Sequence, residues 1–322
     1  MITYLEILLI TLTLGSTVFY LSGAILTYRF FTKIESNEKL LPTNSNQPIS
    51  LLVPVRGIDP GAWENLLSLC NQNYPDYEIL FGVTEINDPA IPLLEKLAAE
   101  FPGKVKLFTG LQPRGINHKD SNLSYLLEKA NHEIIVFADS DIRVESDYLH
   151  TVTTPLEDGK TGLVTCAFIG HNPQSVGAAL ASLGRCVDFI PSVLIARWLD
   201  GGLRFAVGAT MATRKSILDS IGGLHLSRIG SDYNLGKRAA LKGYQVKLSP
   251  YILESDTGFE GIDSVFQREL RWARTIRYNR GSVYYAMIFC YGSWFSLPLI
   301  ILSNFSGWAI ALGVVALLIL SS

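Results

Sequence analysis

Apolar residues concentrate at the two ends of the 322-residue chain, around a central region of alternating polar and apolar stretches. Residues 7–28 carry no charge, and a helix of roughly twenty residues crosses the hydrocarbon core of a bilayer. No basic stretch precedes this segment and no small-residue cleavage site closes it, which favours a retained anchor over a removed signal peptide. We therefore expect a membrane anchor at residues 1–30 and a polar linker at 31–48.

Residues 282–322 are also uncharged, and Pro298 and Gly307 near the middle favour two short helices folded as a transmembrane hairpin. A single long buried helix is the alternative. Basic residues follow the first apolar segment at Arg29 and Lys33, and five arginines between 268 and 280 precede the last. By the positive-inside rule the central domain faces the cytoplasm, so the sequence predicts a multi-pass integral membrane protein.

Short apolar runs alternate with helical periodicity between residues 49 and 138. The apolar runs predict strands at 49–55, 77–84, 105–108 and 133–138. The helical patterns lie between them, at 63–70, 92–101 and 121–130. Strands alternating with helices imply a mostly parallel sheet covered on both faces. We therefore expect a Rossmann-like α/β domain at residues 49–281, with ligands bound beyond the carboxyl ends of its strands.

Two carboxylates follow the predicted strand at 133–138 directly, at Asp139 and Asp141. Hard oxygen ligands with this spacing suit Mg²⁺ or Mn²⁺ carrying a diphosphate. An ordinary surface turn is the alternative for such a pair, but its position after an apolar strand favours the metal site.

Two further groups near strand ends are candidates for nucleotide binding. Asp88 follows the second predicted strand, where its carboxylate could accept hydrogen bonds from a base or ribose, or could simply cap the next helix. Asn117 and Lys119 come just before a predicted helix, and Asn122 lies in its first turn. These side chains could reach the phosphates of a donor. A solvated loop is the alternative for this second group.

Asp232 lies at the start of a helical pattern at 233–241 and is a candidate general base for an acceptor hydroxyl. A plain helix cap is the alternative. Further along, helical spacing places Arg268, Arg271 and Trp272 on one face, where they could close over a diphosphate and the reacting sugar. Here the alternative is a basic, aromatic helix that rests on anionic lipid.

Composition narrows the classes of function. The net charge of −2, with basic residues clustered only beside the apolar segments, gives no reason to expect a nucleic-acid partner. The four cysteines have no metal-binding spacing. The stretch at 172–204 reads as a loop with an interfacial or core apolar segment, and we expect it at an acceptor entrance.

Asp88, the pair Asp139 and Asp141, Asp232 and the motif from Arg268 to Trp272 together resemble the ordered motifs of family 2 type inverting glycosyltransferases. The chain resembles the ceramide glucosyltransferase family more closely, over roughly residues 50–285. The segments that carry this likeness are Val55 to Pro60, Asn73 to Glu78, Asn87 to Ile91, Gly115 to Lys119, Asp139 to Val144 and Gly222 to Leu224.

The resemblance implies a GT-A fold, a UDP-sugar donor, a divalent metal (Mn²⁺ or Mg²⁺) and a β-glycosylated lipid product. It assigns the base to Asp232 and the metal to Asp139 and Asp141. The nucleotide-sugar would contact Pro54, Asp88, Lys119, Asp139, Arg268, Arg271 and Trp272. The acceptor implied is ceramide or another hydroxylated lipid of the bilayer, such as a hopanoid or glycerolipid. A processive polysaccharide synthase and an inactive nucleotide-sugar sensor are the remaining alternatives.

Two departures from the animal members bear on this assignment. Where those members read Asp-Ser-Gly, this chain has Asp139-Ser140-Asp141, which strengthens the expectation of a metal. Where they read Glu-Asp-Tyr, this chain has Ser231-Asp232-Tyr233. The second departure removes an acid beside the expected base.

Overall fold

The computed structural model describes residues 3–37, 47–227 and 230–321. The chain forms two compact units. A sheet unit contains residues 41–182 and 200–265, and a helical unit contains residues 1–40, 183–199 and 266–322. The predicted linker at 31–48 is helical up to Asn37, because the first helix continues that far, and residues 38–46 of it lie outside the described part.

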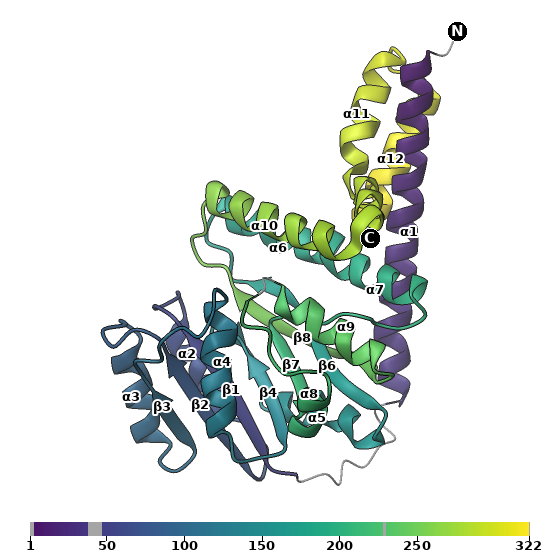
Figure 1. Cartoon of the computed structure of the whole chain (residues 1–322). Helices are drawn as coiled ribbons and strands as arrows, with labels where there is room; N and C mark the ends of the chain where they lie inside the picture. Colours follow the sequence, from purple (N-terminus) through teal and green to yellow (C-terminus); the bar gives the residue numbers. More distant parts are fainter. Residues whose placement is uncertain (1–2, 38–46, 228–229, 322) are drawn as a thin grey trace. The chain divides into compact units, whose positions relative to one another are not determined.

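The sheet unit is built on a single eight-stranded sheet of order β3-β2-β1-β4-β7-β6-β8-β5 (Figure 1). Its strands are β1 Ile49–Val55, β2 Tyr77–Val83, β3 Val105–Phe108, β4 Ile134–Ala138, β5 Ile142–Arg143, β6 Thr161–His171, β7 Thr210–Arg214 and β8 Gln245–Asp256. The first four strands are parallel, whereas β7 runs antiparallel to both β4 and β6.

The first half of the sheet follows the predicted alternation. Its connecting helices are α2 Ala62–Cys70, α3 Ile91–Glu100 and α4 His118–Lys129. Every residue of β2 and of β4 is buried, as expected for strands with helices on both faces. The α/β fold class is confirmed, and the predicted strands and helices of this half end within a few residues of the observed ones.

The second half of the sheet was not predicted. Strands β7 and β8 come from stretches without a clean apolar run, whereas the apolar stretch of β6 was simply not predicted as a strand. Antiparallel β7 makes the sheet mixed. The helices that accompany them are α5 Tyr148–Thr153, α6 Val176–Gly184, α8 Lys215–Ser220 and α9 Ser231–Leu241. The segment read as a loop at 172–204 is also helical, since α6 continues through Arg185–Phe189 into α7 Ile190–Leu199.

A buried ion network fixes the amino end of the sheet. The carboxylate of Glu78, 5% exposed, accepts hydrogen bonds from Ser50 Oγ at 2.6 Å, Lys106 Nζ at 2.7 Å and the Asn131 backbone N–H at 2.7 Å. Burial alone would raise the pKa of Glu78, but these donors outweigh it and lower the pKa to about 2. The network therefore joins β1, β2, β3 and the start of β4.

This network predicts a specific acid sensitivity. Because the folded-state pKa lies below the unfolded value, the stabilisation is complete above pH 4.5 and is lost as the pH falls toward 2. The full contribution is roughly 3 kcal/mol. We expect Glu78→Gln to be less stable at pH 7 and to lose less stability on acidification than the parent protein, measured by thermal unfolding in detergent. The exposed Glu95→Gln change on α3 is the control, and equal acid sensitivity of Glu78→Gln and the parent would contradict the prediction.

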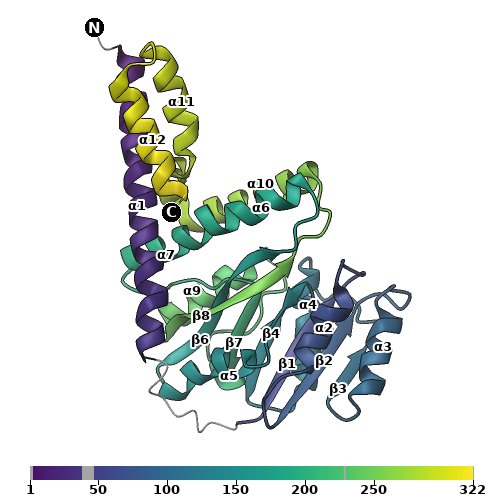
Figure 2. The ribbon, with the colours of Figure 1, turned by 180° about the vertical axis from the view of Figure 1, so that it is seen from behind.

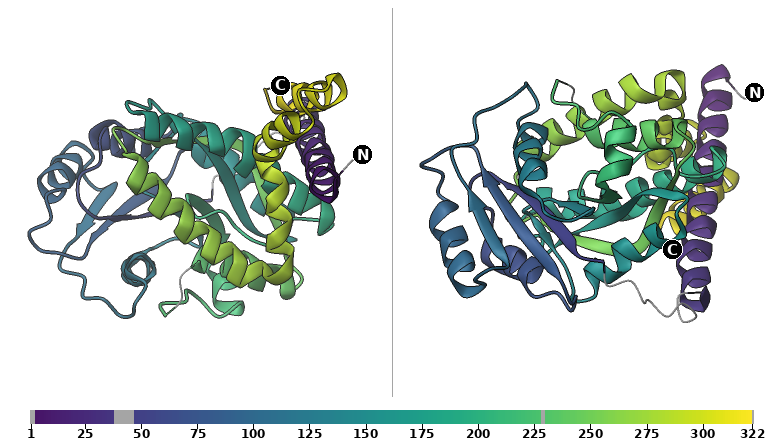
Figure 3. Two further views of the ribbon diagram at one scale, coloured as in Figure 1. Left: turned by 90° about the horizontal axis from the view of Figure 1, so that it is seen from above. Right: turned by 60° about the horizontal axis from the view of Figure 1, so that its bottom comes forward.

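The helical unit consists mainly of apolar helices packed along α1 Tyr4–Asn37. The helices packed along α1 are α7, the 3₁₀ segment Gly281–Tyr291, α11 Gly292–Leu302 and α12 Gly307–Ser321. The unit also contains the polar, arginine-rich α10 (Ile262–Arg280) from Phe266 onward. Helices α11 and α12 lie beside α1 (Figures 1, 2 and 3), and their role as a transmembrane hairpin stays a prediction. Leu9, Leu299 and Ala309 are buried together between these three helices.

Three segments of the described chain are long and apolar enough to cross a membrane: Tyr4–Thr32, Val176–Leu199 and Ile262–Leu302. The first and last agree with the apolar ends of the sequence. The second was not predicted as a span, because Arg185, Asp188 and Arg197 interrupt its apolar pattern.

Tyr20 connects α1 to the C-terminal helices, since its hydroxyl donates to the Cys290 carbonyl at 2.8 Å and accepts from the Gly292 N–H at 2.9 Å.

Candidate active site

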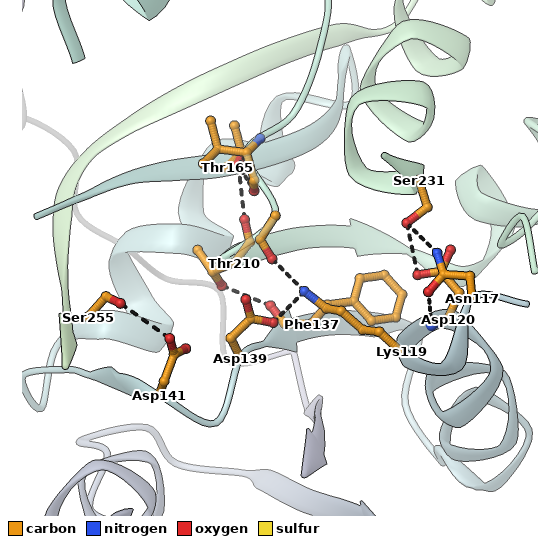
Figure 4. A network of polar contacts seen from close by, with 12 residues as sticks. Asn117, Lys119, Asp120, Phe137, Asp139, Asp141, Thr165, Thr210, Ser231 and Ser255 are labelled. Atoms are coloured by element: carbon orange, nitrogen blue, oxygen red, sulfur yellow. Dashed lines mark hydrogen bonds and ion pairs between the residues drawn. The ribbon is translucent and has the colours of Figure 1, made fainter. Parts of the chain in front are cut away.

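Asp139 and Asp141 follow β4 at the carboxyl edge of the sheet, as predicted (Figure 4). The Asp139 backbone N–H donates to the Ala209 carbonyl at 3.0 Å, so the loop is held against the segment that leads into β7. The Lys119 ammonium forms an ion pair with Asp139 and donates to the Gly208 carbonyl at 3.0 Å. The side chains of Asp139 and Lys119 remain 31% and 39% exposed, so solvent and ligands can reach them.

The electrostatics of this loop favour a bound cation. Burial raises the pKa of Asp141 to about 6, and the neighbouring charge of Asp139 adds to the shift. Burial also raises the pKa of Asp139, although Lys119 partly offsets it. For Lys119, burial acts to lower the pKa, but Asp139 outweighs it and the pKa is raised. The two carboxylates therefore lie close enough to repel each other, and Lys119 is the nearby positive charge.

These residues fit a divalent cation that also binds phosphate. The described part of the chain has no group of three or more His, Cys, Asp or Glu side chains arranged to hold a metal. Mg²⁺ and Mn²⁺ typically take one or two carboxylates and complete their coordination with substrate phosphates and water. Asp139 and Asp141 supply that number of carboxylates, which suits a metal arriving with a diphosphate rather than a preformed protein cage.

Asp232 lies in the first turn of α9, and its carboxylate reaches toward the same region. A Cβ atom added to Gly208 would be 2.5 Å from Asp232 Oδ2, so the acid contacts the residue to which Lys119 donates. Gly230, in the left-handed region with φ 72°, occupies the N-cap position and has no side chain with which to cap the helix. Asp232 is therefore not the N-cap residue of α9, and its role as a base stays a prediction.

The close approach of α9 to the chain before β7 depends on Gly236. A Cβ atom there would lie 2.3 Å from the Ala206 backbone nitrogen and 2.4 Å from the Phe205 carbonyl carbon. Phe205 and Tyr233 stack with ring centroids 5.4 Å apart. The absence of a side chain at Gly236 thus lets α9 pack closely on the chain before β7 and brings Asp232 to the site.

The Asp88 carboxylate accepts hydrogen bonds from two backbone N–H groups of neighbouring loops. The carboxylate is 6% exposed and accepts the Gly57 N–H at 3.0 Å and the Ala90 N–H at 2.9 Å. It joins the loops after β1 and β2, close to Pro54 near the end of β1. The expected nucleotide contact of Pro54 and Asp88 stays a prediction.

Arg268, Arg271 and Trp272 belong to the helical unit. The Arg268 guanidinium lies over the Trp272 ring, 5.5 Å from its centroid, and Trp272 lies 6.3 Å from the Phe189 ring. Arg271 is exposed. Arg268 and Trp272 thus share a face of α10 as predicted, and the role of all three residues in holding a diphosphate stays a prediction.

Sequence analysis missed Asp120, which is 3% exposed beside Lys119 on α4. Its Oδ1 accepts a hydrogen bond from Ser231 Oγ at 2.9 Å, so a carboxylate from α4 lies beside the position where an acid is missing from the sequence. Only the pairing of α4 with α9 reveals this, and no local motif does. Asn122, by contrast, is buried and donates to the Gly82 carbonyl at 2.7 Å, so it cannot reach donor phosphates as expected.

Residues 13–321 match the family model described as glycosyl transferase family 21. The chain is 25% identical to ceramide glucosyltransferase 3 of Caenorhabditis elegans over 76% of its length and 54% of that protein. It is 23% identical to the probable glycosyltransferase YdaM of Bacillus subtilis, over 85% of this chain and 66% of that one. The chain spans about half the length of the Caenorhabditis relatives.

Solved structures share the arrangement of the sheet unit. The mannosyltransferase PcManGT from Pyrobaculum calidifontis, in complex with GDP-Man and Mn²⁺, superposes with a TM-score of 0.55 at 17% identity over 95% of this chain and 86% of that one. GalNAc-T7, solved with UDP, GalNAc and Mn²⁺, gives 0.52 at 12% identity over 68% of this chain and 45% of that one. The likeness shows a GT-A fold.

Proposed function

Because this chain belongs to glycosyl transferase family 21, we propose that it is a hexosyltransferase that moves a sugar from a UDP-sugar to a membrane-lipid hydroxyl. Glucose is the proposed sugar and ceramide the proposed acceptor, since ceramide glucosyltransferases are among the relatives. The product would be a β-glycosyl lipid formed with inversion at the anomeric carbon.

The observation that carries this proposal is the grouping of Asp139, Lys119 and Asp232 beside Gly208 at one edge of the sheet, with Asp141 close to Asp139. A transferase of this kind needs a cationic environment for the departing diphosphate and a separate carboxylate for the acceptor hydroxyl. Lys119, together with a divalent cation that Asp139 and Asp141 would hold, would supply the first requirement, and Asp232 would supply the second. The two functions come from different elements that meet at the same backbone segment.

In the proposed step, Asp232 takes the proton of the acceptor hydroxyl while the acceptor oxygen attacks the anomeric carbon of the sugar. The bond between that carbon and the diphosphate oxygen breaks, and UDP departs with the bonding electrons. Lys119 lies at the start of α4, where its charge and the helix N-terminus favour the diphosphate. A divalent cation held by Asp139 and Asp141 would neutralise charge on the same leaving group when bound.

The remaining assignments follow from the same reaction. Pro54 and Asp88 would border the nucleoside, and Arg268, Arg271 and Trp272 would close over the diphosphate and acceptor. The apolar segments would place the enzyme in the bilayer as a multi-pass protein, with the sheet unit on the cytoplasmic face because of its flanking arginines. A lipid acceptor suits such an enzyme, because the bilayer concentrates the acceptor at the membrane surface.

The test is mass spectrometry of lipid extracts incubated with membranes that contain the protein, Mn²⁺ or Mg²⁺, and a panel of UDP-sugars. We expect a hexosylceramide that depends on UDP-glucose. A glycosylated hopanoid or glycerolipid would keep the reaction and replace the acceptor. Absence of any glycolipid with every donor would contradict the proposal, and UDP binding without transfer would indicate a sensor instead.

A further inference from the structure

The first turn of α4 holds two side chains with different targets. Lys119 reaches Asp139 and the Gly208 carbonyl, as described above. Asp120, the next residue, is buried and turns toward α9 (Figure 4). The turn itself is fixed, because the Asn117 side chain accepts the Asp120 N–H at 3.2 Å and the Asn117 N–H donates to the Leu226 carbonyl at 2.9 Å.

The hydroxyl of Ser231 is held between two groups of this turn. It donates to Asp120 Oδ1 at 2.9 Å and lies 3.3 Å from the Asn117 amide nitrogen, which donates to it. Asp120 Oδ2 is buried and has no hydrogen-bond partner within the described ranges. Burying a carboxylate with so few donors costs stability, so local stability alone does not account for Asp120 at this position.

The contact acts directly on the residue next to the expected base. Ser231 is the first residue of α9, and its N-cap Gly230 provides no side chain to hold the helix start. The hydrogen bond from Ser231 to Asp120 therefore fixes the first turn of α9 in place of a capping side chain. Asp232 follows in the same turn, with its carboxylate against Gly208.

We infer that Asp120 is a positioning residue for the transfer reaction, which through Ser231 fixes the first turn of α9 and thereby the direction of the Asp232 carboxylate. This inference rests on the proposed function of Asp232 as base. It makes α4 the common support of the site, because Lys119 orients the Asp139 loop while Asp120 orients the base. A geometric error of about 1 Å in such a group can lower the rate about 100-fold.

The test compares kcat and KM of four variants of the full-length protein in detergent or nanodiscs. In Asp120→Ala we expect kcat to fall about 10- to 100-fold with KM for the donor almost unchanged, because the base loses its support. Ser231→Ala should show the same loss, and the double variant should be no worse than either single one, because all three break one contact. Asp120→Asn should stay within about threefold of the parent, because its amide oxygen still accepts from Ser231.

Glu128→Ala is the matched control, since Glu128 is an exposed acid at the other end of α4 and should leave kcat unchanged. Unchanged kcat in Asp120→Ala, or additive losses in the double variant, would overturn the inference. Equal losses in Asp120→Asn and Asp120→Ala would also overturn it, because the hydrogen bond would then not be the cause.

A second readout does not need transfer activity. The Asn234 N–H donates to the Gly230 carbonyl at 3.2 Å in the first turn of α9. We expect hydrogen exchange in a peptide covering residues 230–236 to be faster in Asp120→Ala and Ser231→Ala, and near the parent rate in Asp120→Asn. Unchanged exchange in all variants would overturn the inference. An inactive parent protein would contradict the proposed function alone, and exchange would then decide whether Asp120 supports α9.

Discussion

Replacing Asp232 by Asn should lower kcat for sugar transfer by about 10²- to 10⁴-fold, the usual contribution of a general base. Asparagine has nearly the same shape, so the close contact with Gly208 is kept while the ability to take a proton is lost. KM for the UDP-sugar should change little, because in the proposed mechanism the Asp139 loop and α4 hold the donor. The measurement is steady-state glycolipid formation, with UDP binding as a check on folding.

Asp219→Asn provides the control for this prediction, because Asp219 is exposed on α8 and the chemical change is the same. Turnover of Asp232→Asn within about twofold of the parent would remove Asp232 from the role of base, since the expected loss is far larger. A large rise in KM with unchanged kcat would instead assign Asp232 to substrate binding.

Chelation should abolish transfer, and added Mn²⁺ or Mg²⁺ should restore it. Asp139→Asn should then raise the Mn²⁺ concentration required for half-maximal activity by at least about tenfold, because one ligand oxygen and one negative charge are lost. Binding of Mn²⁺ in the presence of UDP, followed by electron paramagnetic resonance, should weaken in parallel. The loss should be largest when both Asp139 and Asp141 are changed, since the two carboxylates lie close to each other.

Asp76→Asn tests the specificity of this effect, because Asp76 is an exposed acid just before β2, at the opposite edge of the sheet. Its metal requirement should equal that of the parent protein. Full activity of the parent after exhaustive chelation would exclude a required metal, and Lys119 would then be the main charge available to the leaving diphosphate.

Local sequence pattern predicted the first half of the fold well, because β1, β2 and β4 are short, almost wholly apolar runs separated by helical periodicity. It failed for β8, whose many polar residues hide a strand pattern that is completed only by pairing with β6. Strand β6 was also not predicted, although its residues 163–169 are mostly apolar. The helix at 190–199 was left open as an interfacial or core segment, since its burial depends on packing against α1.

The site divides in the same way. Asp139 and Asp141 could be found because they follow an apolar strand directly, and Asp232 because it begins a helical pattern. The support from Asp120 could not be found, because it depends on a contact between residues 111 positions apart. Asp88 was placed correctly at a strand end, but its contacts with Gly57 and Ala90 emerge only when two loops fold against each other.

The Glu78 network lies at the amino edge of the sheet, joining β1, β2, β3 and the start of β4, whereas the candidate chemistry lies at the carboxyl edge. The residues that stabilise the sheet and the residues proposed to bind substrate therefore lie at opposite ends of the same strands. Mutations in the carboxyl-edge loops can accumulate without weakening the Glu78 network. Related enzymes can therefore change their sugar donor or their acceptor substrate on an unchanged scaffold. Damaging variants should accordingly fall into two groups, those that reduce the amount of enzyme in the cell and those that leave normal amounts of a slow enzyme.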